Sequence, residues 1–202
     1  GSACSQKKLS EFALENGISG FEFMYCIPGS VGGGLQMNSG CFGTEFKDKL
    51  ISLQCIDTNG NIKIIPSDKI KFKYRKIELS ERLIFLSATF KGNLSSKKKI
   101  KNLMEELALK KNNSQPSKIK TGGSTFKNPI DQTTKKAWEL IKESVPENIN
   151  FGDACISKKH SNFFVNKNNA SFDEMNSLIN FVKKNVKKKT GININLEIKI
   201  IE

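Results

Sequence analysis

The sequence predicts an α+β fold in two domains, and three observations lead to that expectation. Strand patterns and helix patterns both occur, but they do not follow the strict strand–helix–strand order of a doubly wound sheet. A Lys-rich helix pattern around residues 100–112 separates two stretches of different character. The length of 202 residues suffices for one large domain or two small ones.

The first element is a short helix that begins at its N-cap Ser5 and stops at Gly17. Leu9, Phe12 and Ala13 recur at helical spacing, which places them on one face. We therefore expect this face to be apolar.

Strands follow the glycine-rich stretch after this helix. An Asn-Gly pair at 59–60 lies between apolar runs at 49–57 and 62–66, and this arrangement is the strongest short signal for a β-hairpin. Residues 83–90 predict another strand. The Lys-rich helix comes next and is expected to link the two domains.

The second half contains two helices and a strand. Residues 171–174 form a capping-box sequence that begins a long helix ending at Gly191, and residues 163–166 predict a strand. Residues 133–144 predict a helix. Its expected buried stripe is Ala137, Trp138, Leu140 and Ile141.

The C-terminal residues 194–201 alternate between apolar and polar, which predicts a strand. Glu197 would lie on its polar face. The apolar face would carry Ile194, Leu196, Ile198 and Ile200.

The net charge of +13 raises the alternative of a basic nucleic-acid-binding module. Of the 33 basic residues, however, only Arg75 and Arg82 are arginines, the residue type best suited to phosphates and bases. The lysines are therefore interpreted as solvated faces, and nucleic acid is not the expected partner.

The five cysteines are odd in number and never have the C-x-x-C spacing, and His160 is the only histidine. These facts argue against a disulfide framework, a zinc site and a Ser-His-Asp relay, so no metal is expected. No apolar run approaches the roughly 18 residues that cross a bilayer. We expect a cytoplasmic protein without a membrane contact.

Four short segments carry the residue types of a functional site. The first, at 27–40, is rich in glycine, which allows close approach to the backbone or serves as a tightly packed turn. The second, at 121–129, exposes Ser124 between glycines and a lysine. The third, at 73–80, sets Tyr74 beside Arg75 in a strand-like context, where a surface ion pair is the simpler interpretation. The fourth, at 152–166, contains His160 before a strand.

In this order, the four segments and the ending "TGININLEIKIIE" make the chain resemble the UDP-N-acetylenolpyruvoylglucosamine reductase family, the MurB flavoenzymes. The resemblance covers nearly the whole chain. It implies the second half of a vanillyl-alcohol-oxidase-like FAD-binding domain at 1–112 and an α+β substrate domain at 113–202. The family's first flavin-binding subdomain has no counterpart ahead of Gly1, so we expect the chain to act with that subdomain and to be inactive alone.

The resemblance implies that NADPH reduces FAD, and that a hydride then reaches the double bond of UDP-N-acetylglucosamine enolpyruvate. Arg75 would stabilise the enolate, Ser124 would donate the proton to carbon, and Glu197 would be the third active-site group. Another flavin oxidoreductase of related architecture would share the glycine stretch but lack these three together.

Two further sets of residues are implied by the resemblance. The expected FAD contacts are Ile27, Pro28, Gly29, Ser30, Gly32, Gly33, Asn38 and Gly40. The expected substrate contacts are Tyr74, Lys127, Asn128, Ser157, His160 and Asn162.

Overall fold

The structure is a computed structural model that describes residues 1–117 and 119–201. The chain divides into two compact units, Gly1–Lys111 (unit 1) and Asn112–Glu202 (unit 2). Within the described residues, no helix is both long and apolar enough to cross a membrane. Both units mix helices with antiparallel strands, which confirms the predicted α+β class.

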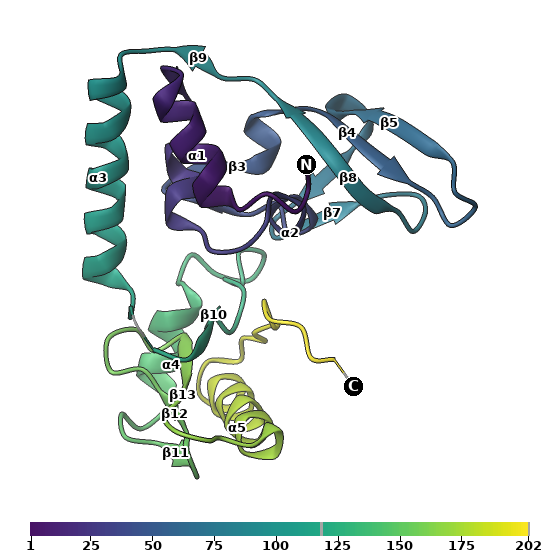
Figure 1. Cartoon of the computed structure of the whole chain (residues 1–202). Helices are drawn as coiled ribbons and strands as arrows, with labels where there is room; N and C mark the ends of the chain where they lie inside the picture. Colours follow the sequence, from purple (N-terminus) through teal and green to yellow (C-terminus); the bar gives the residue numbers. More distant parts are fainter. Residues whose placement is uncertain (118, 202) are drawn as a thin grey trace. The chain divides into compact units, whose positions relative to one another are not determined.

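Unit 1 contains small sheets, short helical turns and a long helix (Figure 1). In chain order its elements are α1 (Gln6–Glu15), β1 (Ile18–Ser19), η1 (Glu22–Cys26), α2 (Val31–Gln36), β2 (Gly40–Cys41), β3 (Thr44–Glu45), η2 (Phe46–Asp48), β4 (Leu50–Ile56), β5 (Ile62–Pro66), η3 (Ser67–Lys69), β6 (Lys71–Lys73), β7 (Lys76–Glu78), β8 (Ile84–Phe90), β9 (Asn93–Leu94) and α3 (Lys97–Ser114). The last of these runs across the boundary between the units.

The largest sheet of unit 1 has the strand order β5-β4-β8, and neighbouring strands are antiparallel. The predicted hairpin is confirmed, because β4 and β5 pair from Ser52 opposite Pro66 to Ile56 opposite Ile62. Gly60 in the connecting turn has a φ of 85°, which explains the glycine there. The predicted strand at 83–90 is β8, on the other edge of β4.

Helix α1 confirms the predicted first element, and the Lys8 N–H donates to the side-chain oxygen of its N-cap, Ser5. Of the predicted apolar face, Ala13 is buried and Leu9 packs on the core, whereas Phe12 is 59% exposed. A polar residue also lies on the inward face: Gln6 is buried and its Nε2 donates to the Ser30 carbonyl. The apolar spacing therefore identified part of the inward face, and Phe12 lies at its exposed edge.

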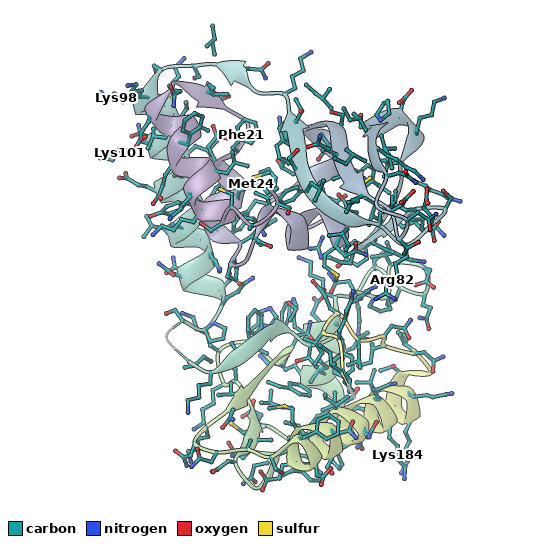
Figure 2. All side chains as sticks on the ribbon, turned by 45° about the vertical axis from the view of Figure 1, so that its right-hand side comes forward. Phe21, Met24, Arg82, Lys98, Lys101 and Lys184 are labelled. Carbon is teal, nitrogen blue, oxygen red and sulfur yellow. The ribbon has the colours of Figure 1, made fainter. Side chains whose placement is uncertain are left out.

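Aromatic rings form the centre of unit 1. Phe46 is fully buried, and its ring meets those of Phe23 and Phe90 edge-on at centroid distances of 6.0 and 5.8 Å. Phe21 and Met24, labelled in Figure 2, are buried in the same unit.

Helix α3 confirms the predicted Lys-rich helix and is longer than expected, at 18 residues. Its buried residues are Ile100, Met104 and Leu107. Lys98 and Lys101 are exposed on the same helix (Figure 2), as expected for a solvated lysine face.

Unit 2 is a sheet of order β10-β13-β12-β11 with helices packed against it (Figure 1). Its elements are β10 (Thr121–Ser124), α4 (Ala137–Ser144), β11 (Asn150–Phe151), β12 (Ala154–Ile156), β13 (Phe163–Asn166) and α5 (Phe172–Thr190). The strand predicted at 163–166 is β13, which lies between β10 and β12.

The two helices of unit 2 match their predictions to different degrees. For α5, both the capping box of Ser171 and Glu174 and the left-handed end at Gly191 are confirmed. Helix α4 begins at Ala137, four residues later than expected. Trp138 was wrongly placed in the buried stripe, since it is 36% exposed while the other three members are buried.

The predicted C-terminal strand at 194–201 was wrong for the described residues up to 201. A single bridge, Phe126 with Leu196, is the whole of the pairing. The alternation nevertheless has a physical basis: Ile194 is buried, and Leu196 and Ile198 pack on the core of unit 2. Ile200 is 38% exposed, so the apolar face ends before it.

Candidate active-site residues

Tyr74 and Arg75 form the two-residue loop that joins β6 to β7, since Lys73 pairs with Lys76. The strand-like context expected for them was therefore wrong. Arg75 has a φ of 54°, a left-handed conformation that a turn normally gives to glycine or asparagine. A bulky residue kept in such a conformation is a reason to look for a function.

The Arg75 guanidinium is largely buried and held from several sides. Its side chain is 18% exposed, and Nη1 lies 3.6 Å from Glu45 Oε1. Nη2 donates to the Gly40 carbonyl at 3.1 Å. The guanidinium carbon lies 4.9 Å from the centroid of the Tyr74 ring, within range of a cation–π interaction.

Asn38 is fully buried and contacts the same group of residues. We call this group, which comprises Asn38, Glu45, Lys47, Tyr74 and Arg75, the Arg75 cluster. Its Nδ2 donates to Glu45 Oε2 at 2.9 Å and to the Lys73 carbonyl at 3.3 Å. Its Oδ1 accepts from the Lys47 N–H at 3.1 Å. In this structure the amide expected to face the flavin is therefore engaged inside unit 1.

The glycine-rich stretch contains helix α2, whose N-cap is Ser30. The Gly33 N–H donates to the Ser30 side chain at 3.1 Å, and the Gly32 N–H donates to the Ser2 carbonyl at 2.8 Å. At Gly34 a Cβ atom would lie 2.5 Å from the Phe46 ring, so packing alone requires glycine there. Both interpretations of the stretch therefore have support: close packing at Gly34 and, at Gly29, an exposed backbone with a φ of 110°.

Ser124 ends strand β10 in unit 2, opposite Phe163 of β13. The next residue, Thr125, contacts the C-terminal tail (residues 192–201), because the Glu197 N–H donates to the Thr125 carbonyl at 2.9 Å. The structure thus brings the segments of Ser124 and Glu197 together, whereas Arg75 belongs to unit 1.

Asn162, expected to contact substrate, is 4% exposed and bonded to the backbone. Its Oδ1 accepts from the Phe126 N–H at 2.9 Å, and its Nδ2 donates to the Phe126 carbonyl at 2.8 Å. The Thr125 N–H also donates to the Asn162 carbonyl. Asn162 therefore holds the segment that follows Ser124.

His160 is part of an aromatic contact in unit 2. Its ring lies 4.8 Å from Phe163, edge-on, and 6.2 Å from Trp138. The Asn162 N–H donates to its Nδ1 at 3.3 Å. Burial lowers the pKa of His160 below its usual value, so the ring is neutral near pH 7.

The remaining predicted substrate contacts have local roles. Asn128 Oδ1 accepts from the Ala137 N–H at 3.0 Å, at the start of α4. The Ser157 hydroxyl accepts from the Lys159 N–H at 3.2 Å. Lys127 is partly buried, and its backbone N–H donates to the Asn195 carbonyl.

Two features of unit 1 were missed from the sequence. Glu45 contacts Arg75, but one glutamate after a glycine-containing turn carries no signal in a single sequence.

Cys41 lies near Cys26, and burial raises the pKa of the Cys41 thiol to about 12, which keeps this thiol protonated and unreactive near neutral pH. All five cysteines are free.

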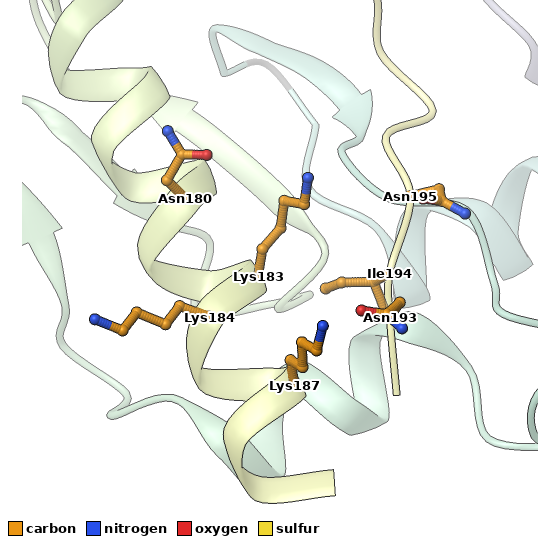
Figure 3. A pocket seen from close by; sticks show the side chains of 7 residues that line it. All are labelled: Asn180, Lys183, Lys184, Lys187, Asn193, Ile194 and Asn195. Carbon is orange, nitrogen blue, oxygen red and sulfur yellow. The ribbon is translucent and has the colours of Figure 1, made fainter. Parts of the chain in front are cut away.

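A hollow of about 450 Å³ lies in unit 2 between α5 and the tail (Figure 3). Its lining residues are Asn180, Lys183, Lys184, Lys187, Asn193, Ile194 and Asn195. None of the residues selected from the sequence as catalytic, cofactor-binding or substrate-binding lines it.

Comparison with known proteins agrees with the motifs. The family model described as the C-terminal domain of UDP-N-acetylenolpyruvoylglucosamine reductase matches residues 115–201. Over its full length the chain is 64% identical to the UDP-N-acetylenolpyruvoylglucosamine reductase of Pelagibacter ubique (strain HTCC1062), of which it covers 67%. A protein of the same name from Rickettsia bellii (strain RML369-C) is 43% identical and is covered to 66%.

A solved structure is similar as well. The crystal structure of UDP-N-acetylenolpyruvylglucosamine reductase (MurB) from Thermus caldophilus superposes with a TM-score of 0.83 at 29% identity, over 96% of this chain and 68% of that one. Fold and motifs together define the class, an oxidoreductase of peptidoglycan synthesis. The chain belongs to the UDP-N-acetylenolpyruvoylglucosamine reductase family, as its motifs predicted. It spans about two thirds of the length of the relatives it matches.

Proposed function

We propose that the chain, together with the family's first flavin-binding subdomain, reduces UDP-N-acetylglucosamine enolpyruvate to UDP-N-acetylmuramate with FAD and NADPH, in the cytoplasm. The observation that carries the proposal is the burial and the backbone conformation of Arg75, together with its neighbours. A largely buried guanidinium sits on a hairpin loop in a conformation that suits glycine, and it has an acidic and an aromatic neighbour. Such a group is suited to binding a carboxylate and to stabilising charge that grows on it.

The substrate's enolpyruvyl group carries a carboxylate, and hydride addition to its double bond leaves an enolate delocalised into that carboxylate. Arg75 would bind the carboxylate and stabilise the enolate. The Ser124 hydroxyl would then give its proton to the carbon atom. Glu197 would complete the site, on the tail segment that bonds to Thr125.

FAD supplies the hydride when bound, after reduction by NADPH. The residues at 27–33 suit close approach by a flat ring or a diphosphate, because Pro28 and Gly29 are exposed. At Gly33 the nearest atom to an added Cβ is the Ser30 hydroxyl, at 3.4 Å. The Gly32 and Gly33 amides already donate within the chain, so we expect their contribution to FAD binding to be the absence of side chains.

The residues expected to contact substrate would act in two ways. Tyr74, Lys127, Ser157 and His160 would contact it directly, with His160 neutral. Asn128 and Asn162 would act by fixing the loop between β10 and α4, because their side chains bond to its ends. We propose that residues 1–112 belong to the flavin-binding domain and residues 113–202 form the substrate domain.

Reconstitution tests the proposal. The 202-residue chain alone should show little turnover. Joined to the part of the Pelagibacter ubique relative that it does not match, it should become yellow and oxidise NADPH only when the enolpyruvyl substrate is present. A joined protein that folds and binds FAD but never reduces the substrate would contradict the proposed function.

A further inference from the structure

We infer that Glu45 is a positioning residue for Arg75, and that the buried Asn38 fixes Glu45 in place. The inference rests on the proposed role of Arg75 toward the substrate carboxylate. It gives Asn38 an internal task in place of the expected contact with the flavin.

The first step concerns the anchors of the guanidinium. The Gly40 carbonyl accepts from Nη2, and the Glu45 carboxylate lies 3.6 Å from Nη1. Gly40 and Glu45 are opposite residues of the β2-β3 pair. These two anchors therefore come from one short hairpin, so the position of the hairpin helps to set the position of the guanidinium.

The second step concerns Glu45 itself, whose two oxygens have different partners. Oε1 faces Arg75, while Oε2 accepts from Asn38 at 2.9 Å and lies 3.0 Å from Lys47 Nζ. The Glu45 N–H donates to Asp48 Oδ2 at 2.8 Å, and the Glu45 side chain accepts in return from the Asp48 backbone. A carboxylate bonded in this way loses little freedom when it holds a cation.

The third step concerns Asn38, which joins the two sides of the cluster. Besides Glu45, its Nδ2 bonds to the Lys73 carbonyl, two residues before Arg75. Its Oδ1 accepts from Lys47 on the other side. This one buried amide thus ties the hairpin that anchors the guanidinium to the loop that carries it.

Backbone conformation points to the same place. Among the described residues, three that are not glycine have a positive φ: Asn38, Phe42 and Arg75, at 39°, 52° and 54°. Phe42 lies in the turn between β2 and β3. Strained conformations persist only where their surroundings hold them, and two of the three, Asn38 and Arg75, belong to this network.

¹H–¹⁵N correlation NMR can test the positioning of Arg75 directly, because the chain has only two arginines and hence two Arg Nε–H signals. In the full chain, Glu45→Gln should shift and broaden the Arg75 signal while that of Arg82 stays constant. Glu78→Gln is the matched control: Glu78 also pairs with lysines and lies on β7, the strand that follows Arg75. It should leave the Arg75 signal nearly unchanged.

Asn38→Asp extends the test to the second residue. It keeps the shape of the side chain but turns the Nδ2 donor into an oxygen that repels Glu45, so it should disturb the Arg75 signal through Glu45. Because a buried charge can prevent folding, the nearly isosteric Glu45→Gln remains the deciding variant. An unshifted Arg75 signal in folded Glu45→Gln would overturn the inference.

Kinetics separate this inference from the proposed function. In the complete FAD enzyme, Glu45→Gln should raise KM for the enolpyruvyl substrate or slow reoxidation by about tenfold to a hundredfold, and reduction by NADPH should stay unchanged. If the wild-type protein never reduces that substrate, the proposed function fails, and the NMR comparison still decides the positioning role. Equal reoxidation kinetics in Glu45→Gln and wild type would count against the inference.

Discussion

The Arg75 cluster of unit 1 and the Ser124 segment of unit 2 are held in different ways. Around Arg75, side chains bond to side chains, and the charges of Glu45, Arg75 and Lys47 take part. Around Ser124, backbone bonds to the tail and one buried amide, Asn162, hold the chain. We therefore expect substitutions in the first region to change affinity and rate, and those in the second to change stability as well.

The largest effect is expected at Ser124. In the complete enzyme, Ser124→Ala should slow reoxidation of the flavin by the enolpyruvyl substrate by about 10²- to 10⁴-fold, which is the rate factor that a positioned proton donor usually contributes. Flavin reduction by NADPH should remain nearly intact, since that half-reaction needs no proton at carbon. Stopped-flow absorbance separates the two steps.

Ser157→Ala is the control for this serine, since its hydroxyl accepts from a neighbouring backbone N–H in the same unit. It should affect substrate affinity more than the rate of the proton step. Equal reoxidation rates in Ser124→Ala and wild type would remove Ser124 from the mechanism.

The next largest effect is expected at Asn162. Asn162→Ala leaves the buried N–H and C=O of Phe126 without their partner, which should cost about 1–3 kcal/mol of the free energy of unfolding for each group. Asn150→Ala, at an exposed asparagine of the same unit, should change it by less than about 0.5 kcal/mol. Urea unfolding of both variants makes the comparison, and similar midpoints would show that the amide does not hold the segment.

Local signals predicted most of the regular elements. Ser5, the Asn-Gly pair at 59–60 and Gly191 mark a cap, a turn and a helix end through short-range geometry, and all three were correct. The C-terminal strand failed because a strand needs a partner, and here the facing segment offers a single bridge at Phe126. Alternation predicts burial, as at Ile194, but it does not predict a ladder.

The candidate site shows the same limit. Arg75, Ser124 and Glu197 could be selected because a family resemblance carries their roles, and these roles stay predictions. The contacts of Asn38 with the Lys73 carbonyl and of Asn162 with Phe126 could not be foreseen, because these partners lie 35 and 36 residues away in the sequence. Those contacts are what assign the two amides to internal support.

A smaller effect is expected for the charge of Glu197. An ionised carboxylate beside the substrate carboxylate and an enolate would repel both, so we expect Glu197 to be protonated in the working complex and to donate a hydrogen bond. Glu197→Gln should then retain much of the activity, within about tenfold, while the shorter Glu197→Asp should lose more. Stopped-flow reoxidation decides: a Gln variant as slow as the Asp variant would instead favour an anion at this position.

The smallest effect is a pH dependence confined to unit 2. Burial holds the pKa of His160 below the usual 6.5, so below pH 6.5 the unfolded chain takes up a proton that the folded chain does not. The free energy of unfolding should therefore fall as the pH falls from about 6.5 toward the pKa of the folded state, and it should level off below that pKa. His160 is the only histidine, so its proton NMR titration gives the folded pKa directly.

Asp57 of unit 1 supplies a control, because its pKa is also shifted but in a separate pH range. Backbone hydrogen bonds from Asn61 and Asn59 lower the pKa of Asp57 to about 2. His160→Gln should flatten the dependence below pH 6.5 while Asp57→Asn leaves it in place, and a His160 midpoint at or above 6.5 would contradict the buried neutral ring.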